Sequence, residues 1–123
     1  MYSYSSHEGY TRYASLENRT VFITGGATGI GASLVEAFMS QGSKVAFVDV
    51  DAEAAALLCD VLKQQGLACP WFQVCDVSNI DALRASILAA QKDVGDIRVL
   101  INNAANDQRY ETLGLTEAQW HQG

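Results

Sequence analysis

Positive charge is scarce in this sequence, and its scarcity excludes two classes of partner. Eight Lys and Arg residues stand against fourteen Asp and Glu residues, so the formal net charge is −6. A chain with this balance offers no basic stripe to neutralise the phosphates of a nucleic acid or the head groups of an anionic bilayer. We therefore expect neither nucleic acid nor a membrane surface as a partner.

Long apolar runs and metal-ligand patterns are missing as well. No run approaches the roughly 20 apolar residues of a membrane span, and the first residues lack the apolar core of a signal peptide. His7 and His121 stand near opposite ends of the chain without a ligand partner beside them, so we expect no metal site. Cys59, Cys69 and Cys75 show neither CxxC nor Cys/His spacing. We expect them to be reduced, mostly buried thiols in a cytoplasmic protein.

Strand and helix patterns alternate regularly along the chain. Apolar and β-branched runs predict strands at 21–23, 44–48, 68–74 and 97–102, and amphipathic segments predict helices at 30–41, 51–65 and 78–94. This alternation predicts right-handed βαβ crossovers and an α/β fold with a Rossmann-type doubly wound parallel sheet in the strand order 3-2-1-4. Pro70 cannot donate to a strand ladder, so the third strand should lie at a sheet edge, as that order requires.

The apolar spacing also predicts which helix faces are buried and where two helices begin. Asp51 is placed to cap the second helix, and Ser78 with Asp81 gives a capping pattern for the third. Gly42 and Gly66 are placed to end the first two helices. The expected inner faces are Ile30, Leu34, Ala37 and Phe38 in the first helix, Ala54, Leu57, Leu58, Val61 and Leu62 in the second, and Ile80, Leu83, Ile87, Leu88 and Gln91 in the third.

A glycine-rich turn follows the first predicted strand in the stretch TVFITGGATGIG at 20–31. The spacing of Gly25, Gly29 and Gly31 lets the backbone turn sharply, approach a ligand and pack the next helix against the strand. The N-terminus of that helix suits a pyrophosphate. Asp49 ends the second strand, where a dinucleotide-binding fold accepts hydrogen bonds from the adenosine ribose hydroxyls. The alternatives are a glycine-rich connection without a ligand and a helix-capping role for Asp49.

Three motifs together resemble the short-chain dehydrogenase/reductases. The residues Thr24-Gly25-x-x-x-Gly29-Ile30-Gly31 are similar to the TGxxxGIG cofactor motif of that family, Asp76-Val77 to its adenine-contacting pair, and Asn102-Asn103-Ala104-Ala105 to its NNAG motif, with Ala105 in place of the usual Gly. The resemblance covers residues 16–120. It implies a cofactor site formed by Gly25, Gly29, Ile30, Gly31, Asp49, Asp76, Val77 and Asn103, with Asn102 tying the fourth strand to its neighbours.

The charge of Asp49 favours NAD over NADP, because it repels a 2′-phosphate and no Arg stands beside it. A finer similarity concerns residues 13–16 and 106–109, which look like the branch of the family that oxidises free aldoses such as xylose, arabinose or galactose with NAD. Asp107 and Arg109 would then border the substrate site. A solvated polar loop is the alternative for these two residues.

The resemblance also implies that the chain holds only part of an enzyme. The family's later Asn, its Ser and its Tyr-x-x-x-Lys pair have no counterpart in the 123 residues, so we name no catalytic residue. Thr116 and Gln119 form a capping box with only four residues after it. We interpret 1–12 as a flexible extension and 13–123 as an incomplete NAD-binding domain whose sheet stops after the fourth strand.

The predicted function is therefore the NAD(P)-binding half of an oxidoreductase. The complete enzyme would oxidise an alcohol or a sugar hydroxyl with NAD and form a homo-oligomer, and this chain alone would be inactive. One alternative is a non-catalytic truncated protein that binds NAD or pairs with the complete enzyme. A more remote alternative is an S-adenosylmethionine-dependent methyltransferase, a class that also uses a glycine-rich first turn and acidic strand ends.

Overall fold

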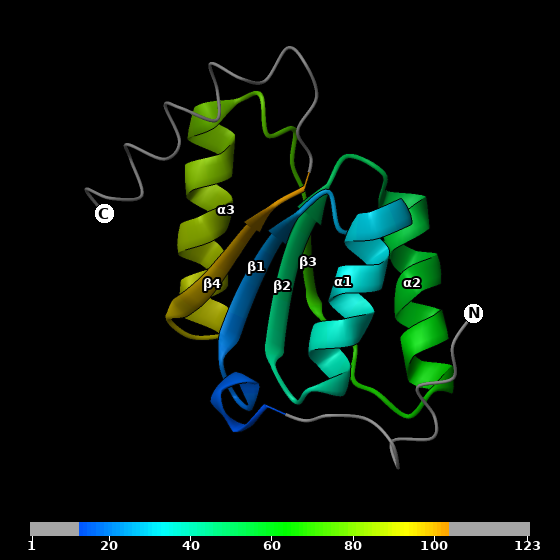
Figure 1. The fold of residues 1–123 in the computed structure, drawn as a ribbon. Coiled ribbons are helices and arrows are strands. Elements are labelled where there is room, and N and C mark those ends of the chain that lie inside the picture. Colours follow the sequence, from blue (N-terminus) through cyan, green and yellow to red (C-terminus); the bar gives the residue numbers. More distant parts are fainter. Residues whose placement is uncertain (1–12, 104–123) are drawn as a thin grey trace.

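The computed structural model of the chain describes residues 13–103, which form a four-stranded sheet with helices on both of its faces (Figure 1). The elements in chain order are a short 3-10 helix at Ala14–Leu16, β1 at Thr20–Thr24, α1 at Gly29–Ser40, β2 at Lys44–Asp49, α2 at Ala52–Gln64, β3 at Trp71–Val74, α3 at Ile80–Asp93 and β4 at Ile97–Asn102. All pairings are parallel, and the strand order is β3-β2-β1-β4. The predicted fold class and strand order are confirmed.

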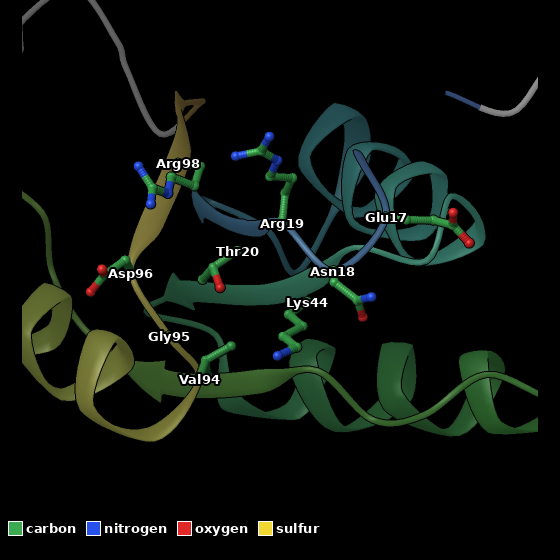
Figure 2. A pocket seen from close by; sticks show the side chains of 9 residues that line it. All are labelled: Glu17, Asn18, Arg19, Thr20, Lys44, Val94, Gly95, Asp96 and Arg98. Carbon is green, nitrogen blue, oxygen red and sulfur yellow. The ribbon is translucent and has the colours of Figure 1, made fainter. Parts of the chain in front are cut away.

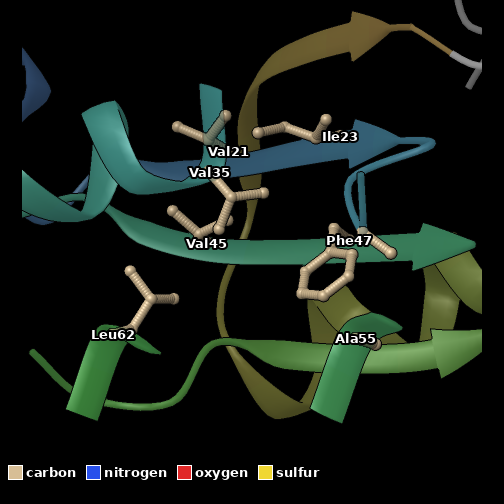
Figure 3. Close-up of a cluster of buried hydrophobic side chains, with 8 residues drawn as sticks. Val21, Ile23, Val35, Val45, Phe47, Ala55 and Leu62 are labelled. Atoms are coloured by element: carbon tan, nitrogen blue, oxygen red, sulfur yellow. The ribbon is translucent and has the colours of Figure 1, made fainter. Parts of the chain in front are cut away.

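The strand β1 forms the centre of the core because both of its faces are covered. All five of its residues are buried, as expected for a parallel strand between two helical layers. Val21 and Ile23 face α1 and α2 and pack with Val35 and Leu62, as Figure 3 shows. The residue between them, Phe22, belongs to a second cluster on the opposite face, under α3. The period-2 alternation of a strand thus divides one apolar run between two core layers.

The ends of the first two helices follow the sequence prediction. The side chain of Asp51 accepts a hydrogen bond from the N–H of Ala54 at 2.9 Å, as an N-cap residue does. Gly42 and Gly66 follow the two helices with φ angles of 85° and 84°. Because this left-handed region is open to glycine at little cost, both residues end their helices without strain.

The predicted cap of α3 is wrong by one residue. Asn79, not Ser78, is the N-cap, and its side chain accepts from the N–H of Ala82 at 3.1 Å. The N–H and the hydroxyl of Ser78 both donate to the carboxylate of Asp76, at 3.0 and 2.7 Å. This local turn occupies the serine, so the helix begins one residue later.

The buried helix faces are narrower than the apolar spacing suggested. Ile30, Leu57 and Leu88 are 72%, 66% and 65% exposed, whereas Val35 and Leu62 are fully buried. The prediction is therefore wrong for one apolar residue or more in each helix. Small residues, rather than these exposed apolar ones, are buried in the helices, which lets the helices approach the sheet closely. These buried small residues are Gly31 and Ser40 in α1, Ala55 in α2, and Ser86 and Ala90 in α3.

The strand β3 lies at a sheet edge, as the single proline predicted, but it is shorter than the predicted 68–74. Pro70 stands just before the strand, which begins at Trp71, so the ladder loses no donor. The indole N–H of Trp71 donates to a carboxylate oxygen of Asp93 in α3 at 2.9 Å. This bond ties the start of the edge strand to the last turn of the helix beneath it.

Two of the three cysteines are joined, which corrects the prediction of free thiols. Cys59 in α2 and Cys69 before β3 form a disulfide, with their Cα atoms 5.2 Å apart. The chain reverses at Gly66 after α2 and brings Cys69 back alongside the helix, a proximity that spacing alone does not reveal. The prediction holds for Cys75, which is free and buried.

Burial raises the pKa of the Cys75 thiol, the neighbouring charge of Asp76 raises it further, and a hydrogen bond with Ser86 opposes them. The thiol is therefore protonated near neutral pH and has little nucleophilic character. The disulfide between Cys59 and Cys69 is a bond more usual in oxidising compartments, so it gives no support to the expected cytoplasmic location. Within residues 13–103, no helix has the length and apolarity that crossing a bilayer requires.

The disulfide leads to a stability prediction. Replacing Cys59 by Ser is expected to lower the free energy of unfolding by about 2 to 3 kcal/mol, because the cross-link restricts the unfolded chain across a short loop. Its two ends are 10 residues apart in sequence. Urea denaturation of the oxidised protein measures the loss. Cys69→Ser should give the same loss, and the double variant should add nothing further. A parent protein whose midpoint is unchanged by a reducing agent would contradict the prediction.

Candidate dinucleotide-binding site

The predicted site residues meet at one edge of the sheet, where the carboxyl ends of the parallel strands lie (Figure 1). Three hydrogen bonds connect them. The N–H of Ala27 donates to Asp49, the side-chain amide of Asn103 donates to the carbonyl oxygen of Gly25, and the N–H of Cys75 donates to the carbonyl oxygen of Asp49. The ends of β1, β2, β3 and β4 thus form one connected surface, the position at which doubly wound sheets bind ligands.

The glycine-rich turn after β1 has a backbone that only glycine adopts easily. Gly25 and Gly29 have φ angles of 67° and 58°, in the left-handed region. The N–H of Gly25 donates to the carbonyl oxygen of Val48 at 2.8 Å, which fixes the turn to β2. A Cβ atom on Gly29 would meet nothing within 4 Å. The turn is therefore rigidly attached at its start and open at its middle, where a ligand can approach the main chain.

Two other glycines serve packing rather than access. A Cβ atom on Gly31 would collide with the carbonyl oxygen of Gly25 and would lie 2.7 Å from the side-chain nitrogen of Asn103. Gly26, which the sequence analysis did not single out, would place a Cβ 2.7 Å from the Cβ of Phe47. Both glycines let α1 and the turn lie directly on the sheet. In the sequence, the doubled glycine at 25–26 was the signal that could have indicated the packing role of Gly26.

The N-terminus of α1 keeps its hydrogen-bond donors available. Its N-cap residue, Thr28, makes no side-chain hydrogen bond to the first turn, and that turn contains no acidic residue. The first N–H groups of a helix have no partner within the helix, and they carry the positive end of its dipole. Ile30 presents an apolar side chain in the same turn, 72% exposed. The arrangement suits an anionic ligand with an apolar portion.

The carboxylate of Asp49 is held in place by two main-chain donors. One oxygen accepts from the N–H of Ala27 and the other from the N–H of Asp51, both at 3.0 Å. Asp49 is half-buried, and each of its oxygens keeps a further lone pair for a ligand. The alternative that Asp49 caps α2 is wrong, because Asp51 is the cap. Ala27, whose N–H orients the carboxylate, was not among the predicted site residues.

Asp76 and Val77, the predicted adenine-contacting pair after β3, differ in their exposure to solvent. Asp76 is exposed, and one of its carboxylate oxygens holds the turn at Ser78. Val77 is only 7% exposed and belongs to the apolar cluster under α3. Its side chain is therefore committed to packing, and only its main chain can face a ligand.

The end of β4 is fastened to the glycine-rich turn by a hydroxyl that the sequence analysis did not assign to the site. Thr24 is fully buried, and its hydroxyl donates to the side-chain oxygen of Asn102 at 2.9 Å. The same hydroxyl oxygen accepts from the N–H of Asn103 at 2.9 Å, and the side-chain amide of Asn103 donates to the carbonyl oxygen of Gly25 at 3.1 Å. Asn102 ties β4 to β1 as predicted, and Asn103 braces the turn as well.

Several predicted features fall outside residues 13–103. They are the predicted substrate residues Asp107 and Arg109, the capping box at Thr116 and Gln119, and the extension at 1–12. In the part of the chain that the structure describes, no three His, Cys, Asp or Glu side chains gather as metal ligands would.

Comparison with known proteins agrees with the geometry. The family model of the short chain dehydrogenases matches residues 19–123. The chain is 44% identical over 110 residues to the probable galactose dehydrogenase of Rhizobium meliloti, a match that covers 89% of this chain and 43% of that protein. It is 38% identical over 108 residues to the D-xylose 1-dehydrogenase of Caulobacter vibrioides, covering 88% of this chain and 42% of that protein.

Among solved structures, a short-chain dehydrogenase/reductase from Serratia marcescens superimposes with a TM-score of 0.69 at 28% identity, over 74% of this chain and 37% of that one. The chain thus spans less than half the length of the curated relatives it matches. These findings decide between the two enzyme classes that the sequence left open, against a methyltransferase. The chain belongs to the short-chain dehydrogenase family.

Proposed function

We propose that the carboxyl edge of the sheet holds the adenosine and pyrophosphate parts of NAD. The observation that carries the proposal is the carboxylate of Asp49, which the N–H groups of Ala27 and Asp51 orient at the end of β2. The lone pairs that remain on its two oxygens suit the two neighbouring hydroxyls of a ribose. Short-chain dehydrogenases bind a nicotinamide dinucleotide, so the chemistry of this site and the family agree.

The rest of the edge fits the same ligand. The open turn at Gly29 and the uncapped first turn of α1 supply main-chain donors for a pyrophosphate. The exposed side chain of Ile30 offers an apolar contact beside them. In this proposal, the carboxylate of Asp76 and the main chain of Val77, which follow β3, contact the adenine ring.

Charge around Asp49 supports NAD rather than NADP. The segments 20–43 and 45–62, which form the turn, α1, most of β2 and most of α2, contain no Lys or Arg. A 2′-phosphate on the adenosine ribose would therefore meet the carboxylate of Asp49 without a compensating cation. A ribose with a free 2′-hydroxyl donates to the same carboxylate instead.

For the complete protein, we propose oxidation of a free sugar hydroxyl with NAD. The printed names of two relatives, a galactose dehydrogenase and a xylose 1-dehydrogenase, support this substrate class. In this proposal Asp107 and Arg109 border the sugar. Homo-oligomer formation and a cytoplasmic location stay predictions.

The residues of this chain contribute binding and orientation to such a reaction. When bound, NAD supplies the hydride acceptor in its nicotinamide ring. Asp49 and the turn at Gly29 fix the other end of the cofactor, which sets its direction across the edge of the sheet. The 123 residues contain no Tyr-x-x-x-Lys sequence, so the proposal assigns no proton-transfer role to them. The alternative of a non-catalytic NAD-binding protein stays open.

The role of Asp49 is tested with Asp49→Asn. This variant is expected to weaken NAD binding roughly 10- to 100-fold, because hydrogen bonds to a charged group contribute about 1.5 to 3 kcal/mol. NADP binding should weaken less or improve, since the repulsion of the 2′-phosphate is removed. Titration calorimetry with both cofactors measures the ratio. Asp60→Asn removes the same charge from an exposed position in α2 and should leave the ratio unchanged. Equal affinity of the parent for NAD and NADP would refute the assignment.

A second test concerns turnover. A polypeptide of these 123 residues should bind NAD but form no NADH with galactose, xylose or arabinose, because its sequence contains no Tyr-x-x-x-Lys pair to accept the substrate proton. The absorbance of NADH measures the reaction, in protein purified without any full-length relative in the expression host. Formation of NADH that depends on the sugar would overturn the non-catalytic interpretation. Because NAD affinity is measured separately, this result would leave the proposed NAD site untouched.

A further inference from the structure

The opposite edge of the sheet, where the strands begin, contains a solvent-open hollow of about 410 Å³. Its lining includes Arg19 before β1, Thr20 at the start of β1, Lys44 at the start of β2, and Gly95, Asp96 and Arg98 around the start of β4 (Figure 2). Because β2, β1 and β4 are neighbours in the sheet, these side chains come together from segments far apart in sequence. The length of β1, about 16 Å for five residues, separates this hollow from the dinucleotide site.

Positive charge gathers in this hollow although the chain is acidic. Arg19, Lys44 and Arg98 are three of the eight basic residues in the sequence. Within residues 13–103, Lys44 and Arg98 make no ion pair or side-chain hydrogen bond, and Arg19 uses only its Nε, which donates to the carbonyl oxygen of Ser15 at 2.9 Å. The terminal donors of all three side chains are therefore available to a ligand.

Thr20 lines the hollow at the start of β1. Thr20 is only 3% exposed, and its side chain makes no hydrogen bond to any of the described residues. A Cβ atom on Gly95 would lie 3.1 Å from the Thr20 hydroxyl oxygen, at a φ angle of 142°. Glycine at this position keeps the approach to the hydroxyl open.

Charged side chains from three segments of the chain surround Thr20. Figure 2 shows the guanidinium groups of Arg19 and Arg98 on one side of Thr20 and the ammonium group of Lys44 on the other. Glu17 and Asp96 also line the hollow, and in this view their carboxylates, like the guanidinium groups of Arg19 and Arg98, point away from Thr20. Three cations and two carboxylates leave the lining with a formal charge of +1.

We propose that this hollow binds a phosphate group, either as inorganic phosphate or on a small phosphorylated metabolite. Guanidinium, ammonium and hydroxyl donors on one surface suit an anion with several acceptor oxygens, such as a phosphate group. The hollow is open to solvent, so the rest of a phosphorylated molecule can extend out of it. The site is independent of the NAD proposal, because it shares no residue with the carboxyl edge.

The test is a titration of the 123-residue chain with inorganic phosphate, followed by amide NMR. Phosphate should shift the amide signals of Thr20, Lys44 and Arg98 in a saturable manner, with a dissociation constant of about 1 mM or below. Chloride at equal ionic strength should not. The amides of 25–31 report separately on the glycine-rich turn. Shifts confined to that turn, or no saturable shift with phosphate, would overturn the proposal.

Two variants separate a built site from general attraction to charge. Thr20→Val removes the hydroxyl while keeping the shape and the net charge, and Lys44→Gln changes an exposed residue that the fold does not need. Each should weaken phosphate binding at least about tenfold, which corresponds to about 1.4 kcal/mol. Lys63→Gln, which removes the same charge outside the hollow, should not. An unchanged affinity in the first two variants, or an equal loss in the third, contradicts a site at Thr20.

Glucose 6-phosphate and glycerol 3-phosphate distinguish the two sources of the phosphate group. Binding of either one more tightly than inorganic phosphate assigns the hollow to a phosphorylated metabolite, and equal or weaker binding assigns it to free phosphate. Either result supports the proposal as long as the Thr20→Val substitution also weakens the binding of the ligand concerned. Binding of unphosphorylated glucose at the same amides with similar affinity would overturn it.

Discussion

The contact between Gly31 and the carbonyl oxygen of Gly25 is the constraint on which the carboxyl edge depends. Any larger residue than glycine at position 31 would push α1 away from the turn, and the uncapped first turn of the helix would no longer lie over the strand ends. The amide of Asn103 donates to that same carbonyl oxygen. The carbonyl oxygen of Gly25 thus positions both the N-terminus of α1, which suits a pyrophosphate, and the end of β4. The buried hydroxyl group of Thr24 holds the end of β4 as well, through its hydrogen bonds with Asn102 and Asn103.

The two edges of the sheet have opposite chemistry, and the sequence order explains why. Asp49 follows the apolar part of β2 and Asp76 follows β3, whereas Arg19 precedes β1 and Lys44 begins β2, although the acidic Asp96 also precedes β4. In a parallel sheet, all strand ends of one kind meet at one edge. Single charged residues far apart in the sequence therefore meet on two separate surfaces. We propose that the carboxyl edge binds ribose hydroxyls and that the edge where the strands begin binds an anion.

The strand order and the glycine-rich turn were predictable because they rest on local patterns: the apolar run of β1, the glycines at 25, 29 and 31, and the edge position of Pro70. The bonds of Thr24 to Asn102 and Asn103 cross 78 and 79 residues of sequence, and only the pairing of β1 with β4 brings these residues together. The same limit applies to the disulfide between Cys59 and Cys69. The outward position of Ile30 depends on how the helix lies on the sheet, which apolar spacing does not specify.

Saturation-transfer NMR of NAD with the 123-residue chain tests the central claim most directly, because it reports which parts of the ligand contact the protein. The account predicts strong transfer to the adenine protons and the adenosine ribose protons, weak transfer to the nicotinamide protons, and loss of all transfer in Gly31→Ala, where the helix is displaced from the turn. Transfer of equal strength to both ends of NAD, or unchanged transfer in Gly31→Ala, would contradict the assignment of the carboxyl edge to the adenosine half of the cofactor.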